Sequence, residues 1–87
     1  MKTVPEIVAA IEAYRPVLVS GIREMAAERG SDPDLLTPAR YIDLLTEEAE
    51  WSDAFAAKRA QALDPEGEKG HRDHAAAVRA IIAQVTS

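Results

Sequence analysis

Apolar residues recur at intervals of three and four along most of the chain, the spacing that places side chains on one face of an α-helix. The pattern is clearest from Pro38 to Leu63, where Thr37 and Pro38 follow the order typical of a helix N-terminus. The stripe consists of Tyr41, Leu44, Leu45, Glu48, Trp51, Ser52, Phe55, Arg59 and Ala62. We therefore predict a central helix over residues 38–63 that supplies much of the core.

A second apolar stripe runs from Val4 to Arg29 and predicts a long first helix. Pro16 should interrupt it, because proline removes a backbone hydrogen bond and clashes with the preceding turn, at a cost of about 3 kcal/mol. Since the stripe passes Pro16 without a change of phase, we predict one helix over residues 4–29, kinked near residues 12–16. The alternative is two short helices that meet at Tyr14 and Arg15.

The third predicted helix covers residues 68–85, where apolar positions again follow helical spacing. Asp64 and Pro65 indicate a turn before it. The sequence contains neither a strand pattern nor an internal repeat. Because three helices with short connections pack as an antiparallel up-down-up bundle, we predict a single all-α domain over residues 1–87.

Composition limits how much core this chain can build. It has 87 residues, and although 47% of them are hydrophobic, many of these are alanines that bury little area each. A domain of this size is close to the lower limit for a self-sufficient core. We therefore expect the chain to be at least dimeric, with the bundle completed by dimerisation.

The charge balance argues against several classes of function. The net charge is −5, and no basic cluster exceeds the pair Lys58-Arg59, which disfavours nonspecific nucleic-acid binding. No apolar run approaches the ~20 residues of a membrane-spanning helix, and Glu6 and Glu12 make the N-terminal segment unlike a signal peptide. The absence of cysteine excludes disulfides and thiolate chemistry. We expect a cytoplasmic protein that binds neither nucleic acid nor membrane.

Acidic residues gather on the side of the central helix opposite its apolar stripe. Asp43, Glu47 and Glu50 share a face, Asp53 lies beside it, and Trp51 is adjacent. Such a run is most often a solvated surface, but it is also suited to docking a protein with a basic surface. Trp51 would be a natural hot spot there, although its place in the stripe favours core packing.

The leading functional hypothesis is therefore a small acidic protein–protein interaction module of the regulator, inhibitor or assembly-factor type. We expect no enzymatic activity and no cofactor, because the sequence shows neither a nucleophile with a nearby base nor a glycine-rich phosphate loop.

A metal-binding helical oligomer is the alternative hypothesis, and it rests on Glu68, His71 and His74. The spacing of Glu68 and His71 resembles the Glu-x-x-His motif of ferritin-like carboxylate sites, over four residues only. The simpler interpretation is that His74 is a half-buried polar residue near Phe55. A metal site would have to form at a subunit interface, because the register of the helices keeps the candidate ligands apart within one chain.

A hairpin that turns around residues 64–65 sets which side chains face each other. In that register His71 faces the pair Lys58-Arg59 rather than a carboxylate, and Glu48 faces Ile82. The distance along the helix between His71 and Ile82 is about 16 Å at 1.5 Å per residue. A metal site within one chain is therefore not expected.

Glu48 requires a partner of its own, because it lies in the middle of an apolar stripe and an isolated buried carboxylate is costly. Arg15 is the best candidate within the chain. The alternatives are Arg23 of the same chain and, from a second chain, Arg59. We expect a structural ion pair that fixes the register of the helices.

Overall fold

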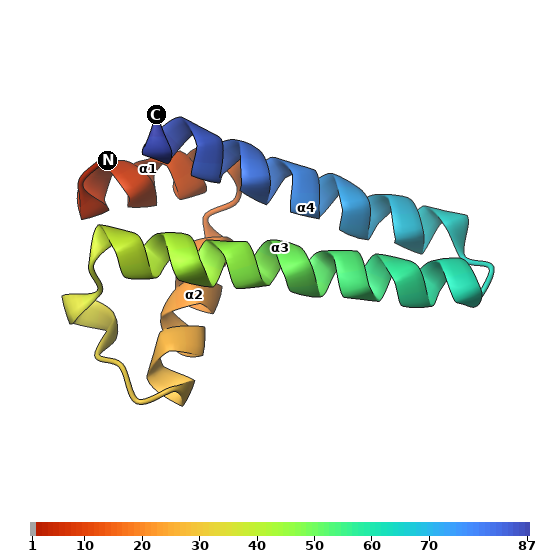
Figure 1. The fold of residues 1–87 in the computed structure, drawn as a ribbon, viewed down its shortest axis with the longest axis horizontal. Coiled ribbons are helices and arrows are strands. Elements are labelled where there is room, and N and C mark those ends of the chain that lie inside the picture. Colours follow the sequence, from red (N-terminus) through yellow and green to blue (C-terminus); the bar gives the residue numbers. More distant parts are fainter. Residues whose placement is uncertain (1) are drawn as a thin grey trace.

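The computed structural model describes residues 2–87, and within them the chain folds into α-helices joined by short connections (Figure 1). The helices are α1 (Val4–Tyr14), α2 (Val17–Glu28), α3 (Pro38–Gln61) and α4 (Pro65–Thr86), with a 3₁₀ turn, η1 (Pro33–Leu35), between α2 and α3. No strand occurs in this part of the chain. The prediction of an all-α fold is confirmed.

The prediction of one kinked helix over residues 4–29 is wrong, and the alternative of two short helices is the one observed, since α1 ends at Tyr14 and α2 begins at Val17. Arg15 is extended, with φ −158° and ψ 105°. A residue before proline is disfavoured in the helical region by contact with the proline ring, so the helix ends where that restriction begins. The apolar stripe continues past Pro16 because both α1 and α2 bury a face against the same core.

Helices α3 and α4 form an antiparallel hairpin that runs along the long axis of the molecule (Figure 1). Helix α4 begins at Pro65, earlier than the predicted residue 68. The Asp64 side chain caps it by accepting a hydrogen bond from the Gly67 amide, and Pro65 occupies the first helical turn. The turn between the helices places Leu63 in the left-handed region, with φ 57°. Its side chain is 88% exposed.

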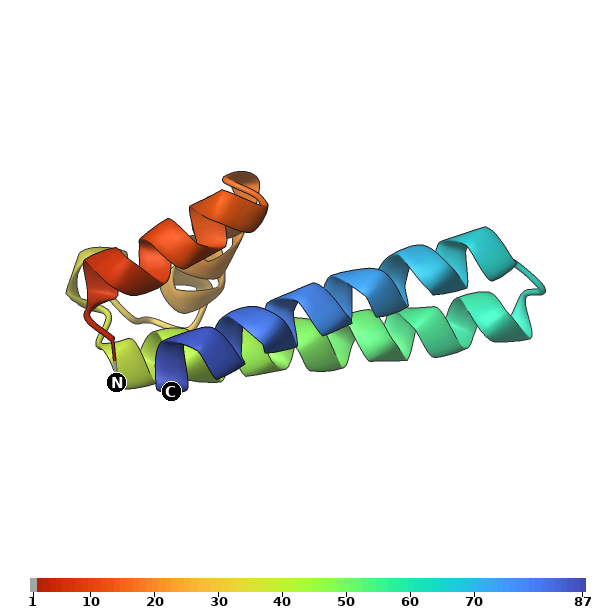
Figure 2. The same cartoon turned by 90° about the horizontal axis from the view of Figure 1, so that it is seen from above.

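Helices α1 and α2 pack against only one end of this hairpin. Figure 2 shows α1 above the end that holds both termini, while the loop end of the hairpin extends past α1 and α2 without cover. The predicted up-down-up arrangement of three helices is therefore replaced by a long hairpin with an angled helix pair on one end.

The core lies where all four helices meet. Its large, fully buried side chains are Ile7, Ile11, Ile22, Leu44, Leu45, Val78 and Val85. Towards the loop end the residues buried between α3 and α4 are small, namely Ser52, Ala56 and Ala75. The hairpin thus has a well-packed end and an end with a thin interior.

Within residues 2–87, no helix combines the length and the apolar character needed to cross a bilayer.

Candidate functional site

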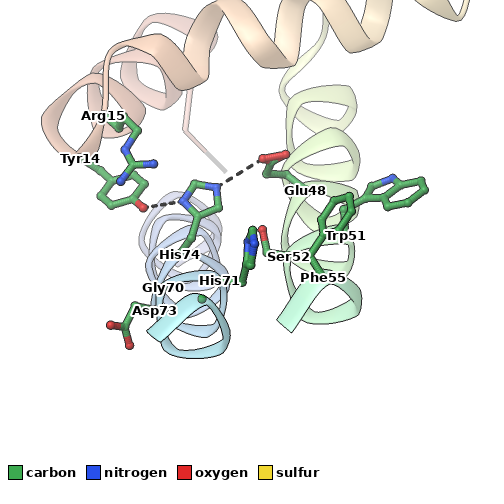
Figure 3. Close-up of a pocket in the computed structure, with 11 residues that line it drawn as sticks. Tyr14, Arg15, Glu48, Trp51, Ser52, Phe55, Gly70, His71, Asp73 and His74 are labelled. Atoms are coloured by element: carbon green, nitrogen blue, oxygen red, sulfur yellow. Dashed lines mark hydrogen bonds and ion pairs between the residues drawn. The ribbon is translucent and has the colours of Figure 1, made fainter. Parts of the chain in front are cut away.

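A groove opens where α1 ends and the uncovered part of the hairpin begins (Figure 3). Its volume is about 790 Å³, and it is open to solvent. Residues from three helices line it: Tyr14 and Arg15 at the end of α1, Glu48, Trp51, Ser52 and Phe55 on α3, and Gly67, Gly70, His71, Asp73 and His74 on α4. Because α1 stops at the proline break, the groove continues the face of the hairpin that α1 covers.

A chain of three side chains crosses the groove from α1 to α3. The hydroxyl of Tyr14 lies 2.5 Å from Nδ1 of His74, and Nε2 of His74 lies 3.3 Å from Oε2 of Glu48. A neutral imidazole has one N–H, so the arrangement that satisfies all three groups has Tyr14 donating to Nδ1 and Nε2–H donating to the carboxylate. The chain links the last residue of α1 to both hairpin helices.

The predicted partner of Glu48 is therefore wrong: it is His74 and not Arg15. The guanidinium of Arg15 instead lies over the ring of Tyr14, 5.2 Å from its centroid. Glu48 also does not face Ile82 as the turn at residues 64–65 implied. The turn is centred nearer Leu63, and a register taken from the turn alone ignores the reach of long side chains along the helices.

Aromatic side chains form a continuous row along the edge of the groove. The rings of Trp51 and Phe55 stack with their centroids 5.9 Å apart, and Phe55 lies 5.6 Å from His71. His71 thus packs near Phe55 and not opposite Lys58 and Arg59, and it takes the place expected for His74. Trp51 is 53% exposed and Phe55 is 42% exposed. The prediction that Trp51 packs in the core is wrong, because no helix formed by residues 2–87 covers this part of the hairpin.

The acidic residues predicted to bind a partner lie near one another on α3 but differ in their surroundings. Glu47 contacts Arg29, while Asp53 binds Arg79 at 2.6 Å and lies 3.8 Å from Arg72. Asp43 and Glu50 are exposed, and neither forms an ion pair within residues 2–87. A shallow depression beside them is lined by Glu47, Glu50, Trp51 and Ala54.

The predicted metal ligands do not converge. Glu68 accepts a hydrogen bond from Arg72 at 3.2 Å, His71 packs against Phe55, and His74 is held in the groove by its two partners. Among the residues that the structure describes, no three His, Asp or Glu side chains are grouped so that they could hold a metal ion. The site between subunits stays a prediction.

The groove also contains a buried polar side chain. Ser52 is only 5% exposed and lines the groove from α3. Within residues 2–87, no buried side-chain nitrogen or oxygen is left without a hydrogen-bond partner.

Sequence reasoning did not find the contact between Tyr14 and His74. The only signal for it was the position of Tyr14 just before Arg15 and Pro16, which would have pointed to the end of a helix. The chain matches no protein-family model, and neither the curated proteins nor the solved structures contain a significant match to it.

Proposed function

We propose that this protein is a helical protein–protein interaction module that docks a partner with a basic surface through the outer face of α3. The observation that carries the proposal is the exposed Trp51, which lines a shallow depression together with the acidic Glu47 and Glu50. Trp and Tyr dominate the binding energy of many interfaces, while surrounding charges select the partner.

The charges beside Trp51 support a partner of opposite sign. Asp43 and Glu50 have no counter-ion among residues 2–87, so their potential extends into solvent. Asp53 contributes less than the sequence suggested, because two arginines of α4 surround it. A partial acidic field of this kind raises the rate at which a basic partner arrives, and the exposed aromatic rings then supply apolar contact area.

The experiment replaces the acidic residues and compares which partner proteins the immobilised wild type and its variants bind. The full chain is immobilised as wild type, as the triple variant Asp43→Gln, Glu47→Gln and Glu50→Gln, and as Trp51→Ala. A control variant carries Glu12→Gln, Glu24→Gln and Glu28→Gln, which make the same change in net charge at exposed positions on α1 and α2. Association rates of each retained protein are then measured from low salt to about 0.5 M, where screening shortens to a few ångströms.

The proposal expects a protein that the wild type and the control variant retain equally. The triple variant should slow its association, and Trp51→Ala should speed its dissociation, without a change in melting temperature of either variant. Association should also slow steeply as salt rises. A retained protein whose association rate is the same for the wild type and the triple variant at every salt concentration would overturn the proposal.

A further inference from the structure

The outer stripe of α3 changes its character from one end to the other. Acidic residues lie at its N-terminal end, aromatic residues in the middle and a basic residue at its C-terminal end. Spacings of three and four keep them on one side of the helix: Glu47, Glu50, Trp51, Ala54, Phe55 and Lys58. All of them are exposed except Glu47, which is half-buried by its contact with Arg29.

A stripe that runs from acidic to basic is complementary to itself when turned end for end. We propose that the partner of this face is a second copy of the chain, with the two α3 helices packed antiparallel around a two-fold axis at Ala54. The inference rests on the function proposed above, since it uses the same surface and names the partner, whose basic contact is Lys58. In a two-fold interface each contact between unlike residues occurs twice.

The charge pairing follows from the positions of Glu50 and Lys58. Each lies four residues from Ala54, on opposite sides, so an antiparallel two-fold at Ala54 brings Glu50 to the height of Lys58 of the second copy. Neither residue forms an ion pair within residues 2–87. Association would therefore create two ion pairs without breaking any.

The apolar contacts follow from the same axis. Trp51 and Phe55 lie within one turn of Ala54 on either side, so Trp51 of each copy lies beside Phe55 of the other. Ala54 is small and exposed, which lets two helix axes approach to the 8–10 Å of ordinary helix packing. The interface would bury the two rings that the hairpin exposes next to its thin interior.

The second copy also fits the position of the face in the fold. The part of α3 nearer the loop extends past α1 and α2 (Figure 2), and Trp51 and Phe55 are exposed there, so a second hairpin can lie alongside it. Two antiparallel hairpins side by side make a four-helix arrangement, in which each helix pair covers the exposed edge of the other.

Charge reversal tests the pairing directly. Glu50→Lys alone places two lysines opposite each other twice in the dimer, and Lys58→Glu alone does the same with two glutamates. The double variant Glu50→Lys with Lys58→Glu restores both pairs in reverse. Glu12→Lys, at an exposed position on α1, is the control that makes the same change in net charge as Glu50→Lys.

Sedimentation equilibrium of the full chain across the micromolar range gives the dimer dissociation constant of each variant. The wild type and Glu12→Lys should dimerise alike, each single reversal should raise the dissociation constant at least about tenfold, and the double variant should return to within about threefold of the wild type. Ala54→Gln adds bulk at the axis with no charge, and it should also weaken the dimer. Circular dichroism confirms that each variant keeps its helices.

The single tryptophan supplies a second readout, since Trp51 lies in the interface. Its emission should shift to shorter wavelength as the wild type is concentrated, and it should not shift for Ala54→Gln. A wild type that is monomeric throughout the range would overturn the inference, as would a dimer that neither reversal nor Ala54→Gln weakens. Either result leaves the docking of a different basic partner to be decided by the acidic triple variant, so the two proposals fail separately.

Discussion

The two ends of the α3–α4 hairpin differ in packing, although the same two helices form both. At the end near the termini, α1 and α2 cover the hairpin and enclose Leu44, Leu45 and Val78 completely. At the loop end no other helix of the described chain is present, the interior holds serine and alanine, and large rings lie on the outside. The difference indicates that stability is concentrated at one end and leaves the other available for contact with a partner.

The largest expected effect comes from the well-packed end. Leu44→Ala removes a side chain that is fully buried among the four helices, and it should reduce the free energy of unfolding by about 2–5 kcal/mol. Urea unfolding followed by circular dichroism, at one fixed protein concentration, measures the change. Ala57→Gly, at an exposed position near the loop end, is the comparison and should cost only about 1 kcal/mol. Equal losses for the two variants would show that the ends do not differ in packing.

A gain in stability is expected at the loop. Leu63 has φ 57°, a conformation that is unfavourable for a residue with a side chain, and its side chain makes little contact because it is largely exposed. Leu63→Gly should therefore raise the free energy of unfolding by up to about 1 kcal/mol. Gly30 already occupies a left-handed position, with φ 78°, and Gly30→Leu should lower stability by a similar amount. Thermal unfolding measures the change in stability of both variants. A change of the same sign in both would contradict the explanation that the left-handed backbone at these positions favours glycine.

An effect of similar size is expected at the contact that joins the two regions. Tyr14→Phe removes the hydroxyl that binds His74 and keeps the ring, so it should cost about 0.5–1.5 kcal/mol. Combining it with His74→Ala makes a double-mutant cycle, and the two changes should not be additive, because they remove the same hydrogen bond. Additive losses would mean that Tyr14 and His74 stabilise the protein independently, and the join between α1 and the hairpin would then have to lie elsewhere.

The helices themselves were accessible from the sequence, because spacing and capping residues are local. The central helix and the last helix were predicted nearly in full. Helix α4 begins at Pro65 rather than at residue 68, because the cap at Asp64 and the proline after it outweigh the weak helix preference of Gly67 and Gly70. The break at Arg15 was predicted only as the alternative, since a continuous apolar stripe was taken to outweigh the local effect of Pro16.

The surroundings of the candidate site were less accessible, because they depend on which helices cover which part of the hairpin. The exposure of Trp51 follows from the lengths of α1 and α2, which reach only one end of α3. The charge of Asp53 is offset by Arg72 and Arg79 of α4, and no pattern along α3 predicts these contacts. The acidic residues lie on α3, while their charge could not be judged without their neighbours.

The chain also closes on itself at the end remote from the loop. The backbone amide of Lys2 donates a hydrogen bond to the carbonyl of Val85 at 3.1 Å, so the two termini lie side by side (Figure 1). A short linker could therefore join the ends into a ring, or the whole unit could be inserted into a surface loop of a host protein. In either format the hairpin loop would point away from the attachment point, and the face that carries Trp51 would be presented to solvent as a rigid arm.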